Sequence, residues 1–281
     1  MIHKHTDKRR SLLTRARRLR PFLLAVLGGI AVLTAGCTTS DTPAKRFSEI
    51  LYQYPDAQEP LRIKKLSAAS AADRDPALQG KTVTVMVHPA YSLFFREEHR
   101  SNYSEAKYDL LKFQLDSEVR FISEIAKTDN LLLLVLPGNF EKQSIAPLSY
   151  INYLNAAAGS GASVYYITSE TWSTGALSLE SMITLFGFVQ RVGAARLLIG
   201  GGYIGRCQRE FYNQVSAYLD KVPTYIIPEI STISPDDISD RESAEILSSL
   251  RLGNYTPVME FIDKKTQGAA DILRLPGAPG L

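Results

Sequence analysis

The stretch Thr82-Val83-Thr84-Val85-Met86-Val87-His88 decides the fold, because a short β-branched run of this kind forms a buried strand. A helical pattern over residues 108–127 follows, with apolar side chains every three or four positions, and then a second apolar run, 131–136. The same alternation continues to about residue 250. It predicts further strands at 163–167, 196–199 and 223–228, and further helices at 145–158, 178–192, 208–219 and 240–250.

Apolar strands that alternate with helices are typical of a parallel sheet covered by helices on both faces. Because crossover connections between parallel strands have one hand, we expect an α/β fold. It should be a three-layer doubly wound domain with a mainly parallel sheet of about five or six strands. The sequence leaves the spatial order of these strands open.

The first 36 residues have the layout of an export signal. Basic residues come first, followed by the apolar run 22–33 and by small residues before Cys37. A run of about a dozen residues is too short to cross a bilayer, which takes roughly 20. The segment Leu33-Thr34-Ala35-Gly36-Cys37 resembles the bacterial lipobox, and this resemblance implies cleavage before Cys37 and lipids on that residue. The alternative is an uncleaved anchor with an incidental cysteine.

The lipoprotein interpretation sets the location and the domain boundaries. Thr38 and Thr39 follow Cys37, without the aspartate that resembles an inner-membrane retention signal. We therefore expect a lipid-anchored protein of the outer membrane, facing the periplasm or exposed at the surface. We divide the chain into a signal peptide (1–36), the lipidated Cys37 with a flexible tether (37–80), an α/β domain (81–262) and a C-terminal tail (263–281).

The charge distribution excludes nucleic acid as a partner. The signal holds 8 of the 32 basic residues and 1 of the 29 acidic residues, so the rest of the chain has a net charge of −4. The basic character of the whole chain therefore belongs to the export signal. The partners we expect are a membrane, reached through the lipid anchor, and an envelope protein or a small molecule.

Cys207 is the second of two cysteines, and a lipidated Cys37 cannot form a disulfide with it. A lone thiol outside the cytoplasm is either a buried, small hydrophobic side chain or a nucleophile. Cys207 lies in the turn from the predicted fourth strand into a helix, beside Arg206 and Arg209. A helix N-terminus and neighbouring cations stabilise a thiolate, so both interpretations stay open.

Ligands of doubly wound sheets bind beyond the carboxyl ends of the strands. Only two histidines follow the signal and no paired-cysteine spacing occurs, so we expect no metal and no cofactor. The polar and aromatic residues after the predicted strands give catalytic candidates, His88 and Cys207, and pocket candidates, Tyr91, Asn139, Thr168, Glu170, Tyr203, Arg206 and Glu229.

The segment 197–207, Leu-Leu-Ile-Gly-Gly-Gly-Tyr-Ile-Gly-Arg-Cys, resembles the nucleophile turn of the isochorismatase-like cysteine hydrolases. In that family a glycine ends a strand six positions before the catalytic cysteine, and Gly201 holds that position before Cys207. Gly175-Ala176-Leu177 is similar to the glycine and leucine that precede the helix before the nucleophile strand. The resemblance extends over about residues 81–252 and implies a hydrolase-like α/β domain with Cys207 at its active site.

Two departures from the family separate two functions. The family has an aspartate where this chain has His88, and a lysine where this chain has Ile167-Thr168-Ser169. Without that acid–base machinery, the fold can serve as a non-catalytic binding or envelope-assembly subunit. The alternative is a cysteine hydrolase of a small amide or related envelope metabolite, with His88 as base for Cys207. Such a dyad requires the first and fourth predicted strands to be neighbours.

Overall fold

The computed structural model describes residues 60–67, 80–90, 103–125, 130–138, 148–158 and 163–275. Cys37, Tyr91 and Asn139 lie outside these residues. Among the helices that are described, none has the length and apolar composition to span a membrane.

Within the described residues, six parallel strands form one sheet, as the sequence predicts. Their spatial order is β1-β4-β3-β2-β5-β6. In the interior of the sheet both faces are buried, because Leu131 to Leu136 contains no exposed residue. The bounds are Lys64–Lys65 (β1), Thr82–Val87 (β2), Leu131–Leu136 (β3), Val164–Thr168 (β4), Arg196–Tyr203 (β5) and Thr224–Thr232 (β6).

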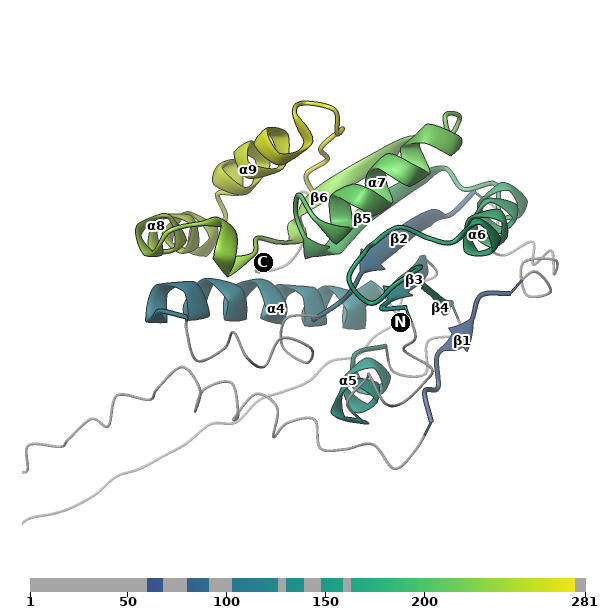
Figure 1. Cartoon of the computed structure of the whole chain (residues 1–281), viewed down its shortest axis with the longest axis horizontal. Helices are drawn as coiled ribbons and strands as arrows, with labels where there is room; N and C mark the ends of the chain where they lie inside the picture. The colour runs from purple at the N-terminus through teal and green to yellow at the C-terminus, as the bar shows by residue number, and fades with distance from the viewer. Residues whose placement is uncertain are drawn as a thin grey trace, which may run out of the picture. The chain divides into compact units, whose positions relative to one another are not determined.

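Helices cover both faces of this sheet (Figure 1). Two helices pack on the face to which Met86 points, and two others on the face to which Val85 and Val87 point. The first pair is α4 (Glu105–Ile125) and α5 (Leu148–Ala158), and the second pair is α6 (Leu179–Arg191) and α7 (Cys207–Tyr218). The short 3-10 helix η2 (Pro235–Asp237), α8 (Asp240–Arg251), which contacts α4, and α9 (Thr256–Thr266), which contacts β6, complete the described fold.

The chain reverses its direction of winding between β2 and β5. From β2 it moves outward through β3 to β4, and then it returns to β5 on the other side of β2 and continues to β6. Val87 of β2 is paired with Gly201 of β5 at this point. The neighbourhood of the first and fourth predicted strands, which a His88–Cys207 dyad requires, is therefore present. Such a reversal is where open α/β sheets commonly bind ligands.

Part of the region we assigned to the tether belongs to the sheet. Lys64 and Lys65 pair with β4, and the backbone nitrogen of Leu66 donates to the oxygen of Tyr166 at 2.7 Å. Ile63 and Leu66 are buried. Two apolar residues three positions apart carry no strand periodicity, and for this reason the sequence pattern does not reveal β1.

Part of the region we assigned to the C-terminal tail also belongs to the fold. Helix α9 continues to Thr266, and Ile272 forms a parallel bridge with Ile226 at the free edge of β6. The segment therefore extends the ordered domain beyond residue 262.

Candidate functional site

The turn that ends β2 holds two residues in a conformation that they adopt at a cost. His88 has φ of 47° and Ala90 has φ of 53°, in the left-handed region that favours glycine. Neighbouring elements hold the turn in place. The backbone nitrogen of His88 donates to the oxygen of Val135 at 2.8 Å, and the hydroxyl of Tyr150 donates to the oxygen of Pro89 at 2.9 Å. Unfavourable backbone geometry of this kind persists where surrounding contacts impose it, often at functional sites.

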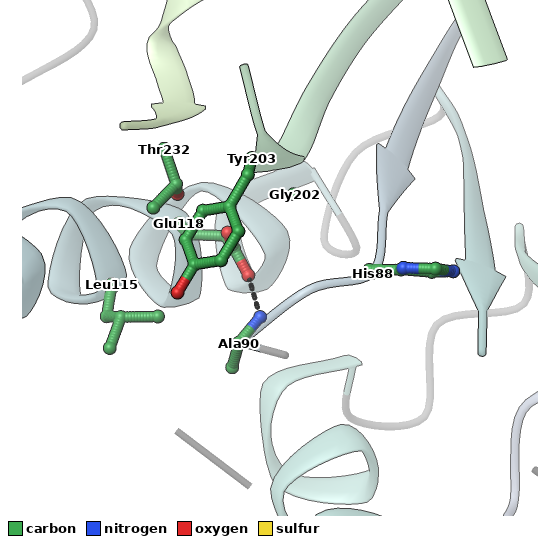
Figure 2. Close-up of a pocket in the computed structure, with 7 residues that line it drawn as sticks. All are labelled: His88, Ala90, Leu115, Glu118, Gly202, Tyr203 and Thr232. Atoms are coloured by element: carbon green, nitrogen blue, oxygen red, sulfur yellow. Dashed lines mark hydrogen bonds between the residues drawn. The ribbon is translucent and has the colours of Figure 1, made fainter. Parts of the chain in front are cut away.

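A small cavity lies beside this turn, at the point where the winding reverses (Figure 2). Its empty space, including the open mouth, is about 220 Å³, but the centre of a water molecule can occupy only about 10 Å³ of it. That volume holds about one water molecule. The described residues that line the cavity are His88, Ala90, Leu115, Glu118, Gly202, Tyr203 and Thr232.

Glu118 of α4 also lines this cavity. It carries a carboxyl group, and it is not among the site residues predicted from the sequence. Its Oε1 atom accepts hydrogen bonds from the backbone nitrogen of Ala90 at 2.6 Å and from the hydroxyl of Tyr153 at 3.4 Å. Burial raises the pKa of Glu118 to about 8, although both donors act to lower it. The sequence does hold a signal for this residue. Position 118 lies three residues after Leu115 and four before Ile122, so a carboxylate stands on the apolar face of the helix.

The imidazole of His88 bonds to the loop after β4. Its Nε2 atom lies 3.0 Å from Oγ of Ser169, and Figure 2 shows the ring directed away from Glu118 and Tyr203. The Ser169 hydroxyl donates its one hydrogen to backbone oxygens, at 2.6 Å to that of Thr171 and at 3.3 Å to that of Leu136. We therefore assign the hydrogen of the His88–Ser169 bond to Nε2. Burial lowers the pKa of His88 to about 4, so the ring is neutral at pH 7.

The thiol of Cys207 is enclosed at the start of α7. A Cβ atom added to Gly202 would lie 2.7 Å from its sulfur, and one added to Gly175 would lie 1.9 Å from its carbonyl oxygen. Glycines thus let two backbone segments approach the residue closely. Burial raises the pKa of the Cys207 thiol to about 11, with a smaller rise from Glu210, although backbone hydrogen bonds oppose the change. The thiol is therefore protonated at neutral pH.

The cations that flank Cys207 in the sequence have other partners. Arg206 Nη2 donates to Oδ1 of Asp237 at 2.9 Å, and its guanidinium lies 5.7 Å from the ring centre of Tyr203. Arg209 Nη1 donates to the backbone oxygen of Lys265 at 3.2 Å. Both guanidinium groups are thus bonded elsewhere, and burial has the largest effect on the pKa of the Cys207 thiol.

The remaining pocket candidates are placed as follows. Tyr203 lines the cavity together with His88. Thr168 ends β4, and its backbone oxygen accepts from the hydroxyl of Ser181 at 3.5 Å, whereas Glu170 is exposed. Glu229 is buried in β6 and bonds to Arg274. Within the described ranges, no group of three potential ligands could hold a metal ion.

Comparisons with known proteins give only distant structural likeness. No family model and no curated protein matches the chain. Among solved structures, the crystal structure of the YcaC gene product from Escherichia coli, an octameric hydrolase of unknown specificity, matches with a TM-score of 0.38 and 12% sequence identity. The match covers 70% of this chain and 76% of that chain. A likeness at this score decides neither the fold nor the activity of this protein.

Proposed function

We propose that this protein is a lipid-anchored, non-catalytic subunit that binds or assembles with another component of the cell envelope on a hydrolase-like α/β scaffold. The observation that carries the proposal is the state of Cys207. Its thiol is buried and protonated, and the imidazole expected to act as its base is bonded to Ser169. A nucleophilic cysteine instead needs a thiolate and an adjacent base.

The size of the cavity supports the same proposal. Pockets for small organic ligands usually measure about 300–1,000 Å³. The cavity at the reversal of winding admits the centre of a water molecule to about 10 Å³. The described residues therefore leave no room there for an amide substrate in the observed conformation.

The lipid anchor and the outer-membrane location rest on the sequence around Cys37. Basic residues, an apolar run and small residues precede this cysteine in the order of a lipoprotein signal. Stable membrane attachment takes at least two acyl chains, as a lipidated N-terminal cysteine would supply. Partner binding would then take place beside a membrane surface.

The cysteine hydrolase remains the second candidate, because Cys207 has the expected place in the fold. It begins α7 just after β5, and β5 is paired with β2. Catalysis in this site would require the backbone around Gly202 to move away from the sulfur and His88 to exchange its partner.

Thiol titration distinguishes the two functions. In the full chain with Cys37→Ser, Cys207 is the only cysteine. We expect its alkylation by iodoacetamide to be slow at neutral pH, to accelerate only toward pH 11, and to be insensitive to His88→Ala. Urea-unfolded protein provides the reference rate, and the additional Cys207→Ser change provides the blank. A thiolate pKa below about 8.5 that rises on His88→Ala would instead establish the hydrolase mechanism.

A further inference from the structure

A short C-terminal segment, Asp271-Ile272-Leu273-Arg274-Leu275, lies along the free edge of β6. We call it the strap. The backbone nitrogen of Ile226 donates to the oxygen of Asp271 at 2.8 Å, and the nitrogen of Leu273 donates to the oxygen of Ile226 at 3.1 Å. Ile272 and Ile226 form a parallel bridge. The strap therefore occupies the edge where another extended peptide could add to the sheet.

The side chains of the strap alternate as those of a strand do. Ile272 packs against the core on the α6 and α7 side of the sheet, whereas Leu273 and Leu275 pack against the core on the α4 and α5 side. Specificity in strand addition comes from pockets that receive alternate side chains. The edge of β6 provides such apolar contacts on both faces.

A carboxylate and an aromatic ring receive the arginine of the strap. Glu229 of β6 is buried, and its Oε1 atom accepts from Nε of Arg274 and from the backbone nitrogen of Leu275, the latter at 3.3 Å. The guanidinium of Arg274 lies 4.7 Å from the ring centre of Tyr255. A buried carboxylate beside an aromatic face is suited to a guanidinium, which hydrogen-bonds in its plane and stacks through its face.

The strap donates hydrogen bonds to only one of the two carboxylate oxygens of Glu229. The Oε2 atom of Glu229 is buried and has no hydrogen-bond partner among the described residues. A guanidinium that lay in the plane of the carboxylate could donate a hydrogen bond to each oxygen. This bidentate geometry is the strongest arrangement for the pair. The intramolecular ligand thus leaves part of the binding capacity of the site unused.

We propose that the edge of β6, with Glu229 and Tyr255, is a binding site for an extended peptide that carries an arginine, and that the strap is its intramolecular ligand. The partner is a protein segment with the pattern of the strap, apolar residues followed by arginine. Such a partner binds when it displaces residues 271–275. This inference goes beyond the proposed function, because it holds whether or not Cys207 reacts.

The first experiment measures binding to a site without the strap. The chain is ended after Gly268, and the probe is the fluorescently labelled, amidated peptide of residues 270–275. The matched control peptide carries citrulline, an uncharged isostere, in place of arginine. Because a hydrogen bond to a charged group is stronger than one between neutral groups, we expect the arginine peptide to bind at least about tenfold more tightly.

Three comparisons complete this experiment. Glu229→Gln in the shortened chain should remove the preference for arginine, and the full chain should bind the labelled peptide more weakly because its own strap competes. Full-chain Arg274→Ala should restore part of the binding. Equal affinity for the two peptides, or no binding by a shortened chain with a cooperative thermal transition, would overturn the proposal.

A second measurement covers the case in which the shortened chain does not fold. Full-chain Arg274→Ala should lose thermal stability, since it leaves the buried carboxylate of Glu229 without its cation. Ethylguanidinium should then raise the midpoint of the thermal transition of Arg274→Ala. It should raise neither the midpoint of the wild type nor that of the double variant that carries both Glu229→Gln and Arg274→Ala. The same response in all three proteins would show that no guanidinium site exists.

Discussion

The Oε1 atom of Glu118 lies 2.6 Å from the backbone nitrogen of Ala90 and thereby ties helix α4 to the turn that ends β2. This contact supports a residue with a positive φ, next to Pro89 and the similarly strained His88. A buried acid thus stabilises the backbone at the point where the winding of the sheet reverses. The contact is structural in the described geometry, and it makes the turn sensitive to the charge of Glu118.

The wild type should lose stability as the pH becomes alkaline, and Glu118→Gln should abolish this loss. The pKa of Glu118 is raised from 4.5 to about 8 in the folded protein, so the folded state holds its proton more tightly than the unfolded chain. The contribution to stability is present below pH 4.5 and is lost as the pH rises through 8. A shift of this size corresponds to about 5 kcal/mol. Urea unfolding at intervals from pH 5 to 9 measures it.

Glutamine is the suitable replacement, because its Oε1 can still accept from Ala90. Tyr153→Phe provides a control that removes one donor to Glu118 without removing the titrating group. If Glu118→Gln and wild type lose stability in parallel between pH 5 and 8, the carboxyl does not titrate as described.

In the His88→Asn variant, the free energy of unfolding should decrease less steeply as the pH is lowered. Burial lowers the pKa of His88 from 6.5 to about 4, so the unfolded chain takes up a proton more readily than the folded protein. The contribution to stability is present above pH 6.5 and is lost as the pH falls through 4, by about 3 kcal/mol in total. Asparagine tolerates the positive φ at this position. Acid unfolding followed by circular dichroism should show a shallower decline in the variant; an unchanged decline would contradict it.

Gly175→Ala should destabilise the domain and expose Cys207. A Cβ atom at residue 175 would lie 1.9 Å from the backbone oxygen of Cys207, a distance that only movement of the backbone can relieve. Overpacking of this kind costs about 1–3 kcal/mol. Thermal unfolding and the alkylation rate of Cys207 measure both effects.

Gly187→Ala is the matched control for that substitution. Gly187 lies within α6, and its added Cβ atom would meet only the flexible end of Arg191, at 3.3 Å. Alanine in a helix interior stabilises by about 1 kcal/mol relative to glycine. A Gly175→Ala protein as stable as Gly187→Ala would show that the backbone around Cys207 yields easily.

The parts of the fold that were predictable are those with a periodic pattern. The all-apolar run 131–136 and its counterparts identify the five long strands and the parallel sheet. Strand β1 and the strap carry too few residues for a pattern, and tertiary contacts alone place them. Both β5 and β6 continue past the predicted ends, to Tyr203 and Thr232. Their pairing shifts register on both sides of Gly201, and a shift of this kind leaves no periodic pattern in the sequence.

The position of the candidate site in the sheet could be predicted from the sequence, but the hydrogen bonds of its residues could not. The rule for doubly wound sheets locates His88 and Tyr203 at the cavity. It does not reveal that the His88 imidazole turns to Ser169, because that choice depends on the relative positions of two distant loops. Glu118 was missed although its position on an apolar helix face marks it, since its burial follows from packing against Ala90 and Tyr153.

A chain that begins at Lys81 should be less stable than one that begins at Pro60. Strand β1 pairs with β4, and the buried side chains of Ile63 and Leu66 flank it. Complete burial of each such side chain contributes about 1.5–3 kcal/mol before the entropy of ordering the segment is subtracted. Urea unfolding of the two chains measures the difference. Equal midpoints would mean that β1 adds nothing to the sheet and that the whole region 37–80 acts as a tether.

Cys37→Ser should release the protein from the membrane or leave it unprocessed. In the lipoprotein hypothesis, the acyl chains on Cys37 provide the attachment, and a serine hydroxyl cannot form the same thioether. Metabolic labelling with a fatty-acid analogue should mark wild type and not the variant, and fractionation should recover wild type with the outer membrane. Cys207→Ser is the matched control, because it removes the other thiol while the lipidation sequence stays intact. Labelling that survives Cys37→Ser would overturn lipidation at this residue, and unlabelled wild type that stays in the membrane at full length would favour an uncleaved anchor.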